Sequence, residues 1–247
     1  MPSPGHHTGH TTTSILCALS IRALTITNCN TVTPMGRLLV RTDNAAPGTQ
    51  LDLAVLAIAR RSCVAVDLAT NAILRVHHPR QVGLQPFSVV RAEVGDPQAE
   101  RTEQPEAIDV RLPLRPLGRL VGVRCERLLR SIGTDADHSS LGIPGPGIPL
   151  WQLDGSRPSV EVLRIPSSAT ISVDERGVRC SFRWDRGAES LPVEDIRLLR
   201  QLDWLPSGRL SLRDCTPALG FRPSRMTVAL SRPTNGYCYK VIASLLP

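Results

Sequence analysis

The chain contains little lysine and few aromatic residues, and it lacks an apolar run that would cross a membrane. Lys240 is the only lysine among 29 cationic side chains, and only three tryptophans, three phenylalanines and two tyrosines occur in 247 residues. The apolar run 51–59 is far shorter than the roughly 20 residues of a membrane-spanning helix. The stretch 14–21 is a poor secretory signal, because no lysine or arginine precedes it. We therefore expect a cytoplasmic protein with no membrane partner.

Recognisable catalytic and cofactor-binding motifs are also missing. The sequence contains no Gly-x-Ser-x-Gly elbow, no His-Glu-x-x-His pair and no dinucleotide-binding glycine fingerprint. Its seven cysteines form no Cys-x-x-Cys pair, which is the spacing that zinc sites require. The sequence therefore predicts no catalytic residue, no metal and no cofactor, and it predicts reduced cysteines. His77 and His78 are expected to form a surface pair.

The charge of the chain is compatible with a polyanionic partner but does not identify one. The formal net charge is +7 at pH 7, and the isoelectric point is about 9.5. Arginine binds phosphate groups through a bidentate fork, so a basic, arginine-rich chain can bind nucleic acid. The arginines are nevertheless spread along the whole chain, from Arg22 to Arg232, which favours a GC-rich coding sequence as their origin.

The first half of the chain is expected to form a β-rich unit. Residues 1–34 show no periodicity and are interpreted as a disordered tail, or as an artefact if Met35 and not Met1 is the true start. Residues 35–140 are assigned to a β-rich domain with one amphipathic helix. Its predicted elements are a hairpin of 63–68 and 72–77, strands at 87–94 and 108–112, a helix over 117–132, and a segment, 51–59, that fits a buried helix or a buried strand.

The middle of the chain is expected to form an antiparallel β-meander at 150–192. The Gly/Pro-rich stretch 133–149 is interpreted as a linker that leads into it, or as an ordered loop that packs under Trp151. The predicted strands of the meander are 160–165, 170–173 and 178–184, which alternate in polarity and are separated by turn sequences. The loop of 133–154 also contains a cluster of two aspartates and a histidine, with Asp154 nearby in sequence. This cluster is the basis of the third functional hypothesis, an uncharacterised enzyme. Its residues are Asp135, Asp137 and His138.

Residues 193–247 have the pattern of a helical unit. A first helix is predicted over 193–202, where apolar residues recur at helical spacing and acidic residues lie near the N-terminus. A second helix is predicted after Ser211, whose side chain is placed to form a capping box with Asp214. Two helices are therefore expected here in succession.

A tight turn and a third predicted helix follow. Gly220 suits a turn that needs a positive φ, and Pro223 suits the first position of a helix over 223–230. The dipeptide Asn235-Gly236 then predicts a tight turn before a final strand.

This unit resembles the winged helix–turn–helix families, in which one helix of the motif reads the DNA major groove and a β-wing contacts the backbone. Pro217 departs from the family pattern, because a proline inside a helix removes a hydrogen bond. The resemblance implies that 223–230 is the recognition helix and that double-stranded DNA is the partner. The implied contacts are Arg222, Ser224, Arg225 and Thr227 in the groove, and Arg209, Arg232 and Lys240 on phosphates.

The sequence as a whole predicts an α+β fold. Its β-rich N-terminal and central body would include the antiparallel meander, and the unit at 193–247 would be helical. The expected function is a DNA-associated or regulatory protein. A non-enzymatic module that binds a protein partner is the alternative, with an uncharacterised enzyme third.

Overall fold

We describe the protein from a computed structural model, in which the described residues are 45–59, 62–78, 83–97, 101–134, 139–175, 177–184, 187–201 and 208–247. These residues form thirteen strands in three sheets, with three short α-helices. The fold is β-rich to its end, and the final element of the chain is a strand. The predicted α+β class with a helical C-terminal unit is therefore wrong. The predicted tail at 1–34 lies outside the described residues.

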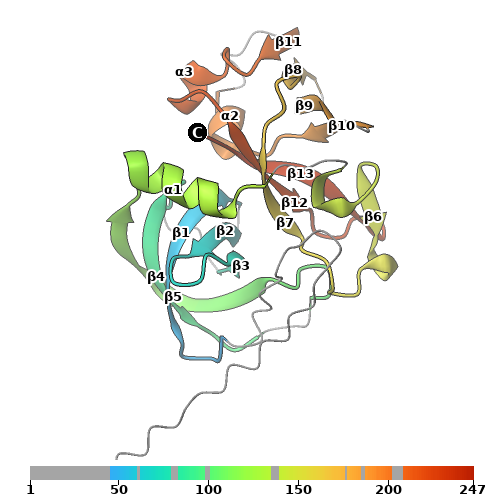
Figure 1. Cartoon of the computed structure of the whole chain (residues 1–247). Helices are drawn as coiled ribbons and strands as arrows, with labels where there is room; N and C mark the ends of the chain where they lie inside the picture. Colours follow the sequence, from blue (N-terminus) through green and yellow to red (C-terminus); the bar gives the residue numbers. More distant parts are fainter. Residues whose placement is uncertain are drawn as a thin grey trace, which may run out of the picture.

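A closed five-stranded barrel forms the N-terminal part of the fold (Figure 1). Its strands are β1 (Gln50–Ile58), β2 (Ser62–Asp67), β3 (Ile73–His77), β4 (Ser88–Val94) and β5 (Ala107–Arg119). β1, β2 and β3 are successive antiparallel neighbours, and β4 returns to the free edge of β1, which is a Greek-key connection. β5 closes the barrel by pairing in parallel with β3 and antiparallel with β4.

The sequence predicted most of this barrel. The hairpin of 63–68 and 72–77 is confirmed as β2 and β3, and the strand at 87–94 is confirmed as β4. The ambiguous segment 51–59 is strand β1. Six consecutive residues of β1 are buried, so the strand shows no alternation of polarity that would have distinguished it from a buried helix.

The amphipathic helix predicted after the barrel is confirmed, although it is shorter than expected. It is α1 (Gly122–Ile132), which buries Cys125, Leu128, Leu129 and Ile132. The earlier apolar residue of the predicted stripe, Leu117, belongs instead to β5. α1 is the longest helix among the described residues, none of whose helices is long and apolar enough to span a membrane.

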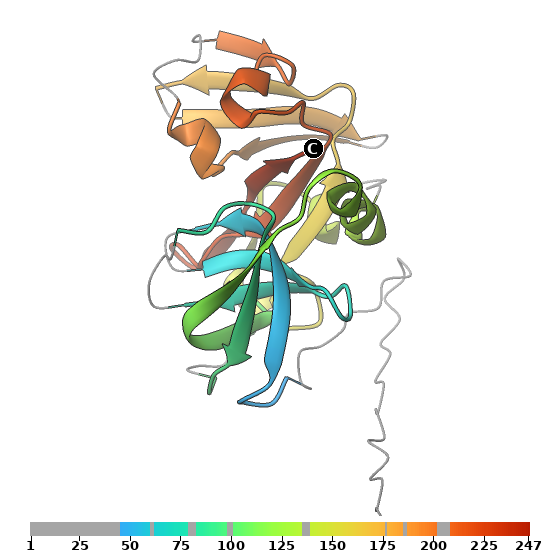
Figure 2. The same cartoon turned by 90° about the vertical axis from the view of Figure 1, so that its left-hand side faces the viewer.

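Two four-stranded sheets make up the rest of the fold. The central sheet has the order β6-β13-β12-β7 and consists of β6 (Gly147–Pro149), β7 (Val160–Arg164), β12 (Arg225–Leu230) and β13 (Tyr237–Leu246). The outer sheet has the order β10-β9-β8-β11 and consists of β8 (Thr170–Asp174), β9 (Gly177–Trp184), β10 (Gly187–Pro192) and β11 (Gly208–Ser211). In Figures 1 and 2 the barrel and the outer sheet lie at opposite ends of the molecule, with the central strands between them.

The central sheet is buried on both faces. One face packs against the barrel and α1 through Val162, Ala229 and Val241. The opposite face packs against the outer sheet through residues such as Met226 and Ile242. A third apolar cluster fills the barrel interior. Because apolar residues alternate between two buried faces, β12 and the second half of β13 read as nearly continuous apolar runs.

The region interpreted as a winged helix–turn–helix unit has a different structure. Its described residues, 193–201 and 208–247, contain only two helices of four residues each, α2 (Ile196–Leu199) and α3 (Thr216–Leu219), together with strands β11, β12 and β13. The segment 223–230, predicted as a recognition helix, is mostly strand β12, which pairs with β7 on one side and β13 on the other. The predicted resemblance to winged helix–turn–helix families is therefore wrong.

Some local signals in this region were correct even though the unit was not. Gly220 has a φ of 79° and ends α3. The Ser211 hydroxyl donates a hydrogen bond of 2.8 Å to the Asp214 carboxylate, but Ser211 does not cap α3, whose N-cap is Cys215. The Asn235-Gly236 turn precedes β13 as predicted. Pro217 lies in the first turn of α3, where a proline costs no hydrogen bond. These features specify turns and a single helical turn, and they do not require a longer helix.

The predicted meander is also corrected in part. β8, β9 and β10 are successive antiparallel neighbours, as an antiparallel meander requires. The strand predicted at 160–165 is present as β7, but it pairs with β12 in the central sheet. Its partner follows it by about sixty residues, and no local pattern indicates a pairing over that separation.

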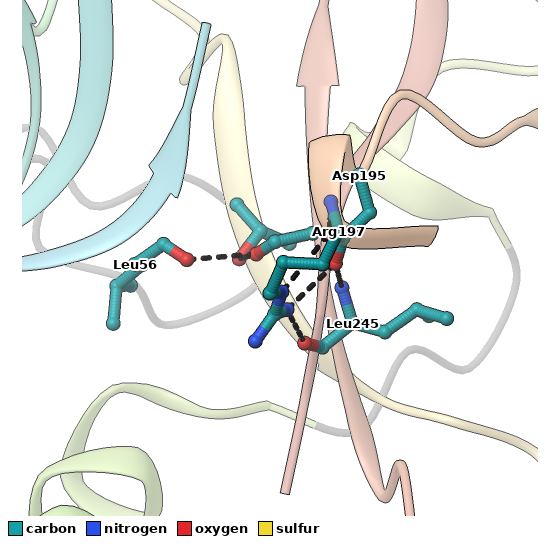
Figure 3. A network of polar contacts seen from close by, with 6 residues as sticks. Leu56, Asp195, Arg197 and Leu245 are labelled. Carbon is teal, nitrogen blue, oxygen red and sulfur yellow. Dashed lines mark hydrogen bonds and ion pairs between the residues drawn. The ribbon is translucent and has the colours of Figure 1, made fainter. Parts of the chain in front are cut away.

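A buried carboxylate holds the end of β13 in place. Asp195 is the N-cap of α2 and accepts hydrogen bonds from the backbone N–H groups of Arg197 and Leu245, both at 2.9 Å (Figure 3). The guanidinium of Arg197 makes a bidentate contact with the same carboxylate, at 3.0 and 2.6 Å, and also donates to the carbonyl oxygen of Leu245. α2 is thus attached to the central sheet through one ion pair.

Removing this carboxylate should destabilise the fold. We expect Asp195→Ala to lower the free energy of unfolding by about 2–3 kcal/mol, because it leaves Arg197 and two backbone N–H groups without their acceptor. Urea denaturation followed by circular dichroism measures the change. Glu194→Ala is the control: Glu194 is exposed, so this substitution should change the stability by less than about 0.5 kcal/mol. Equal losses in the free energy of unfolding for the two substitutions would contradict the structural role of Asp195.

Candidate functional site

A broad groove lies between the central and outer sheets. Its volume is about 1170 Å³. Five arginines line it, from segments far apart in the sequence. The full lining is Arg164, Ile165, Pro166, Ser167, Ala169, Arg183, Trp184, Ser211, Leu212, Arg213, Arg222, Pro223, Ser224 and Arg225. We call this surface the arginine groove. None of the described residues that line it is acidic.

Strand pairing brings two of these arginines together from the central sheet. Arg164 at the end of β7 is directly opposite Arg225 at the start of β12 in the antiparallel register. Directly opposed residues on neighbouring strands have adjacent side chains on one face of the sheet. The two guanidinium groups therefore belong to one surface of the groove.

The outer sheet contributes the other wall of the groove. Arg183 lies near the end of β9, and Arg213 follows β11. Arg222 lies in the segment that leads into β12. The side chains of Arg183, Arg213 and Arg222 make no ion pair with any residue in the described part of the chain, and all three residues are exposed. Their positive charges are therefore available to an anion in the groove.

The groove also contains an aromatic ring. Trp184 at the end of β9 is half-buried, and its ring packs edge-on against Phe182 at a centroid distance of 4.9 Å. The Trp184 Nε1 atom is buried and has no hydrogen-bond partner among the described residues. The hydroxyl groups of Ser167, Ser211 and Ser224 also line the groove. The site thus combines fixed positive charge, hydroxyl groups and one large aromatic side chain.

The structure brings together three of the seven predicted nucleic-acid contacts. Arg222, Ser224 and Arg225 all line the arginine groove, although they approach it from an extended segment and not from a helix. Arg225 donates a hydrogen bond of 3.3 Å to the Ser224 hydroxyl and another of 3.3 Å to the carbonyl oxygen of Pro247. The other four predicted residues lie elsewhere.

Two of those four are exposed but do not line the groove. Arg209 on β11 donates a hydrogen bond of 3.2 Å to the Thr170 hydroxyl. Arg232 lies in the connection between β12 and β13. Neither residue belongs to the surface that gathers the other arginines.

The remaining two are buried and structural. The Thr227 hydroxyl lies 3.1 Å from that of Ser244, which donates to the carbonyl oxygen of Leu56 in the barrel. Lys240 is fully buried, where it pairs with the Glu189 carboxylate and donates a hydrogen bond of 2.8 Å to the Ile143 carbonyl oxygen. Neither side chain reaches a ligand at the surface.

Sequence reasoning missed four groove residues, namely Arg164, Arg183, Trp184 and Arg213. Each lies at the end of a strand or in the turn that follows one, which is a weak local signal for a binding position. Their convergence depends on the pairing of β7 with β12 and on the packing of the outer sheet. Both are long-range contacts, so the sequence contained no direct indication of them.

A second group of polar residues lies within the fold and connects the barrel to β7. The Arg75 guanidinium donates hydrogen bonds of 3.1 and 3.2 Å to the carbonyl oxygen and the hydroxyl of Ser159, and it faces Glu106 at 3.8 Å. Ser159 in turn donates to Glu106. These groups are buried and bind one another, and only Arg75 Nε among their polar atoms lacks a hydrogen-bond partner within the described residues. We therefore assign them a structural role.

His77 and His78 are both buried, which corrects the prediction of a surface pair. His77 Nε2 lies 3.0 Å from the Gln104 side-chain oxygen. Burial lowers the pKa of His77 to about 4, and the positive charge of Arg101 acts in the same direction. His77 is therefore neutral in the folded protein near pH 7.

Neither a metal site nor a reactive thiol is found among the described residues. They contain no cluster of three or more histidine, cysteine, aspartate or glutamate residues that could hold a metal ion. The residues behind the enzyme hypothesis, at 135–138, lie outside the described residues. The five described cysteines are free and buried, and burial raises the pKa of Cys63 and of Cys180 to about 12.

Comparison of the chain with protein-family models, with curated proteins and with solved structures found no match.

The state of His77 predicts a pH dependence of stability. The unfolded histidine binds a proton below its ordinary pKa of about 6.5, whereas the folded one remains neutral down to a pKa of about 4. Between these values the unfolded chain binds more protons, so stability falls as the pH decreases, by up to about 1.4 kcal/mol per pH unit from this group.

Urea denaturation between pH 7 and 4 tests this prediction. His77→Gln should reduce the pH dependence relative to the wild type, because glutamine does not titrate. The expected difference between the two curves develops below pH 6.5 and stops growing near pH 4. Parallel curves for the two proteins over this range would show that His77 does not hold the assigned neutral state.

Proposed function

We propose that this chain is a non-enzymatic nucleic-acid-binding protein, and that a single strand is bound in the arginine groove. The single observation that carries the proposal is the convergence of five arginines, with no acidic residue among the described lining, on one surface of about 1170 Å³. Arginine forms bidentate, charge-assisted hydrogen bonds with phosphate oxygens. A surface of this composition favours a ligand that carries several negative charges.

The shape of the site favours a single strand over a duplex. Duplex readers place a helix or a β-ribbon in the major groove, and the helix proposed for that purpose is strand β12. The arginine groove is concave and has arginines from both sheets, so a slender polyanion would contact both walls. A positively charged groove that follows the backbone is the usual arrangement for single-stranded ligands.

Trp184 favours nucleic acid over an acidic protein segment. Bases stack on aromatic side chains in single-strand-binding sites, and each such contact is worth about 1–3 kcal/mol. Trp184 lies in the same groove as Arg183 and Arg213, so phosphate contacts and base stacking can occur together. An acidic peptide would use the arginines but would gain little from the ring.

An exposed aromatic patch favours a second candidate, the protein-interaction module. Trp151 is 81% exposed, and the rings of Tyr237 and Tyr239 stack at a centroid distance of 6.2 Å on β13, next to the edge strand β6 of the central sheet. Exposed aromatic residues are common in protein-binding surfaces. This candidate predicts no salt-dependent affinity for nucleic acid, so the experiment below separates it from the first.

A short labelled oligothymidylate should bind, and its affinity should fall steeply with salt. Each neutralised phosphate contributes about 0.7 to the slope of log K against log salt concentration for a single strand. Fluorescence anisotropy over a salt series measures this slope. We expect the same sequence in a duplex to bind more weakly, and polyglutamate of equal total charge to compete poorly.

Removing two groove arginines should change the slope by a defined amount. Arg213→Ala combined with Arg222→Ala should weaken binding and reduce the magnitude of the slope by about 1.4, because two phosphate contacts are lost. Arg124→Ala combined with Arg127→Ala is the control, since these arginines lie on the exposed surface of α1 and the change in net charge is the same. The control should retain the wild-type slope.

Two outcomes would contradict the proposal. If both double variants lose affinity equally, binding depends on net charge and not on the groove. If no salt-dependent affinity is measured for single strands, the protein-interaction module becomes the better description.

A further inference from the structure

A second concave surface lies between the barrel and the paired helices α2 and α3. Its volume is about 560 Å³. Leu84, Phe87 and Val121 line it on the barrel side, and Ile196, Leu219 and Phe221 line it on the side of the helices. We call this surface the Phe221 cleft. No residue in its lining belongs also to the arginine groove, so the two surfaces are distinct.

The walls of the Phe221 cleft are mostly apolar, and part of this apolar surface faces water. Val121, which immediately precedes α1, lines the cleft and is 67% exposed. Each square ångström of apolar surface removed from water contributes about 25 cal/mol. An apolar group in the cleft would cover Val121 and contact Phe221, and it would therefore gain free energy from burial alone.

The charged residues that line the cleft all have the same sign. They are Arg119, Arg197 and Arg200, and no acidic residue occurs in the lining among the described residues. Arg197 is already bound to Asp195, and its guanidinium lies 5.2 Å from the centre of the Phe221 ring. Arg119 and Arg200 are exposed and make no ion pair within the described part of the chain.

We propose that the Phe221 cleft binds a small amphiphilic carboxylate, such as a medium-chain fatty acid. The hydrocarbon chain lies against Val121 and Phe221, and the carboxylate is held by Arg119 and Arg200 at the cleft. Clefts of about 300–1000 Å³, apolar with a few placed polar groups, are typical of small-molecule sites. This inference does not depend on the nucleic-acid proposal, because the two sites share no lining residue.

The chemistry of the cleft discriminates against the other occupants. A polyanion would place further charges against apolar walls, at a high desolvation cost. A neutral apolar molecule would leave the arginines without a partner, and a cationic amphiphile would be repelled by them. A carboxylate with an apolar body satisfies both the walls and the charges.

Isothermal titration calorimetry with decanoate, decanol and decyltrimethylammonium tests the assignment. All three carry the same hydrocarbon chain and are used below their micellar concentrations or, for decanol, below its solubility. We expect decanoate to bind at least about tenfold more tightly than decanol, because charge-assisted hydrogen bonds to a carboxylate are stronger than hydrogen bonds to a neutral hydroxyl. The cationic amphiphile should show no binding. Equal affinities of decanoate and decanol, or no binding of decanoate, would overturn the proposal.

Paired variants separate the charge from the apolar wall. Arg119→Gln combined with Arg200→Gln should reduce the affinity for decanoate to that for decanol, whereas Arg124→Gln combined with Arg127→Gln should leave the tenfold preference intact. Val121→Glu should weaken both ligands, and Val123→Glu should weaken neither, because Val123 is equally exposed but lies outside the cleft lining. Thermal denaturation of each variant verifies that it folds.

The comparison between matched variants is decisive. If Val123→Glu reduces binding as much as Val121→Glu, the ligand is held by a general apolar surface and the cleft is not its site. If both arginine pairs abolish the preference for decanoate, the preference reflects net charge. Because neither result concerns the arginine groove, failure of this proposal would leave the oligothymidylate experiment unaffected.

Discussion

The fold depends on the β12–β13 hairpin, whose two strands must be buried on both faces at once. Ala229 and Leu246 face the barrel and α1, whereas Met226 and Leu245 face the outer sheet. Every other layer of the molecule packs on this hairpin or on a strand paired with it. A strand with two buried faces carries apolar side chains at nearly every position, and this requirement explains both the stability of the arrangement and the difficulty of recognising it from the sequence.

Buried polar groups fix the position of the hairpin relative to its neighbours. Lys240 on β13 is held by Glu189 on β10, and Asp195 accepts the backbone N–H of Leu245. The Thr227 and Ser244 hydroxyls connect the same hairpin to the barrel. Such contacts are directional, unlike apolar packing, so they specify which layer the hairpin meets and in which register. Two of the predicted surface contacts, Thr227 and Lys240, therefore serve the interior of the fold.

Elements that a local sequence pattern specifies were predictable, whereas elements that depend on contacts between distant segments were not. The hairpin of β2 and β3 has a turn between two apolar runs, and α1 has an apolar stripe at helical spacing; both were found from the sequence. β12 was interpreted as a helix because Gly220 suits a turn and Pro223 suits the first position of a helix. Its residues are buried at nearly every position, so they show no alternation of polarity that would have indicated a strand. The pairing of β7 with β12 depends on contacts between distant segments, which a single sequence does not reveal.

The same distinction applies to the candidate sites. Arg222, Ser224 and Arg225 were chosen for the wrong reason, as part of a helix, yet they line the arginine groove because they belong to one continuous segment beside Gly220.

The same segment separates the two concave surfaces. Gly220 and Phe221 line the Phe221 cleft, and the next residue along the chain, Arg222, lines the arginine groove. The positive φ of Gly220 ends α3 and sends the chain into the extended conformation that leads to β12. The segment therefore forms a wall between two concave surfaces of different chemistry, one basic and open, the other apolar with a basic edge. A helix in this position would have presented a convex face to the major groove of a DNA duplex. The extended segment instead borders a concave surface, and the proposed ligand is therefore a single strand.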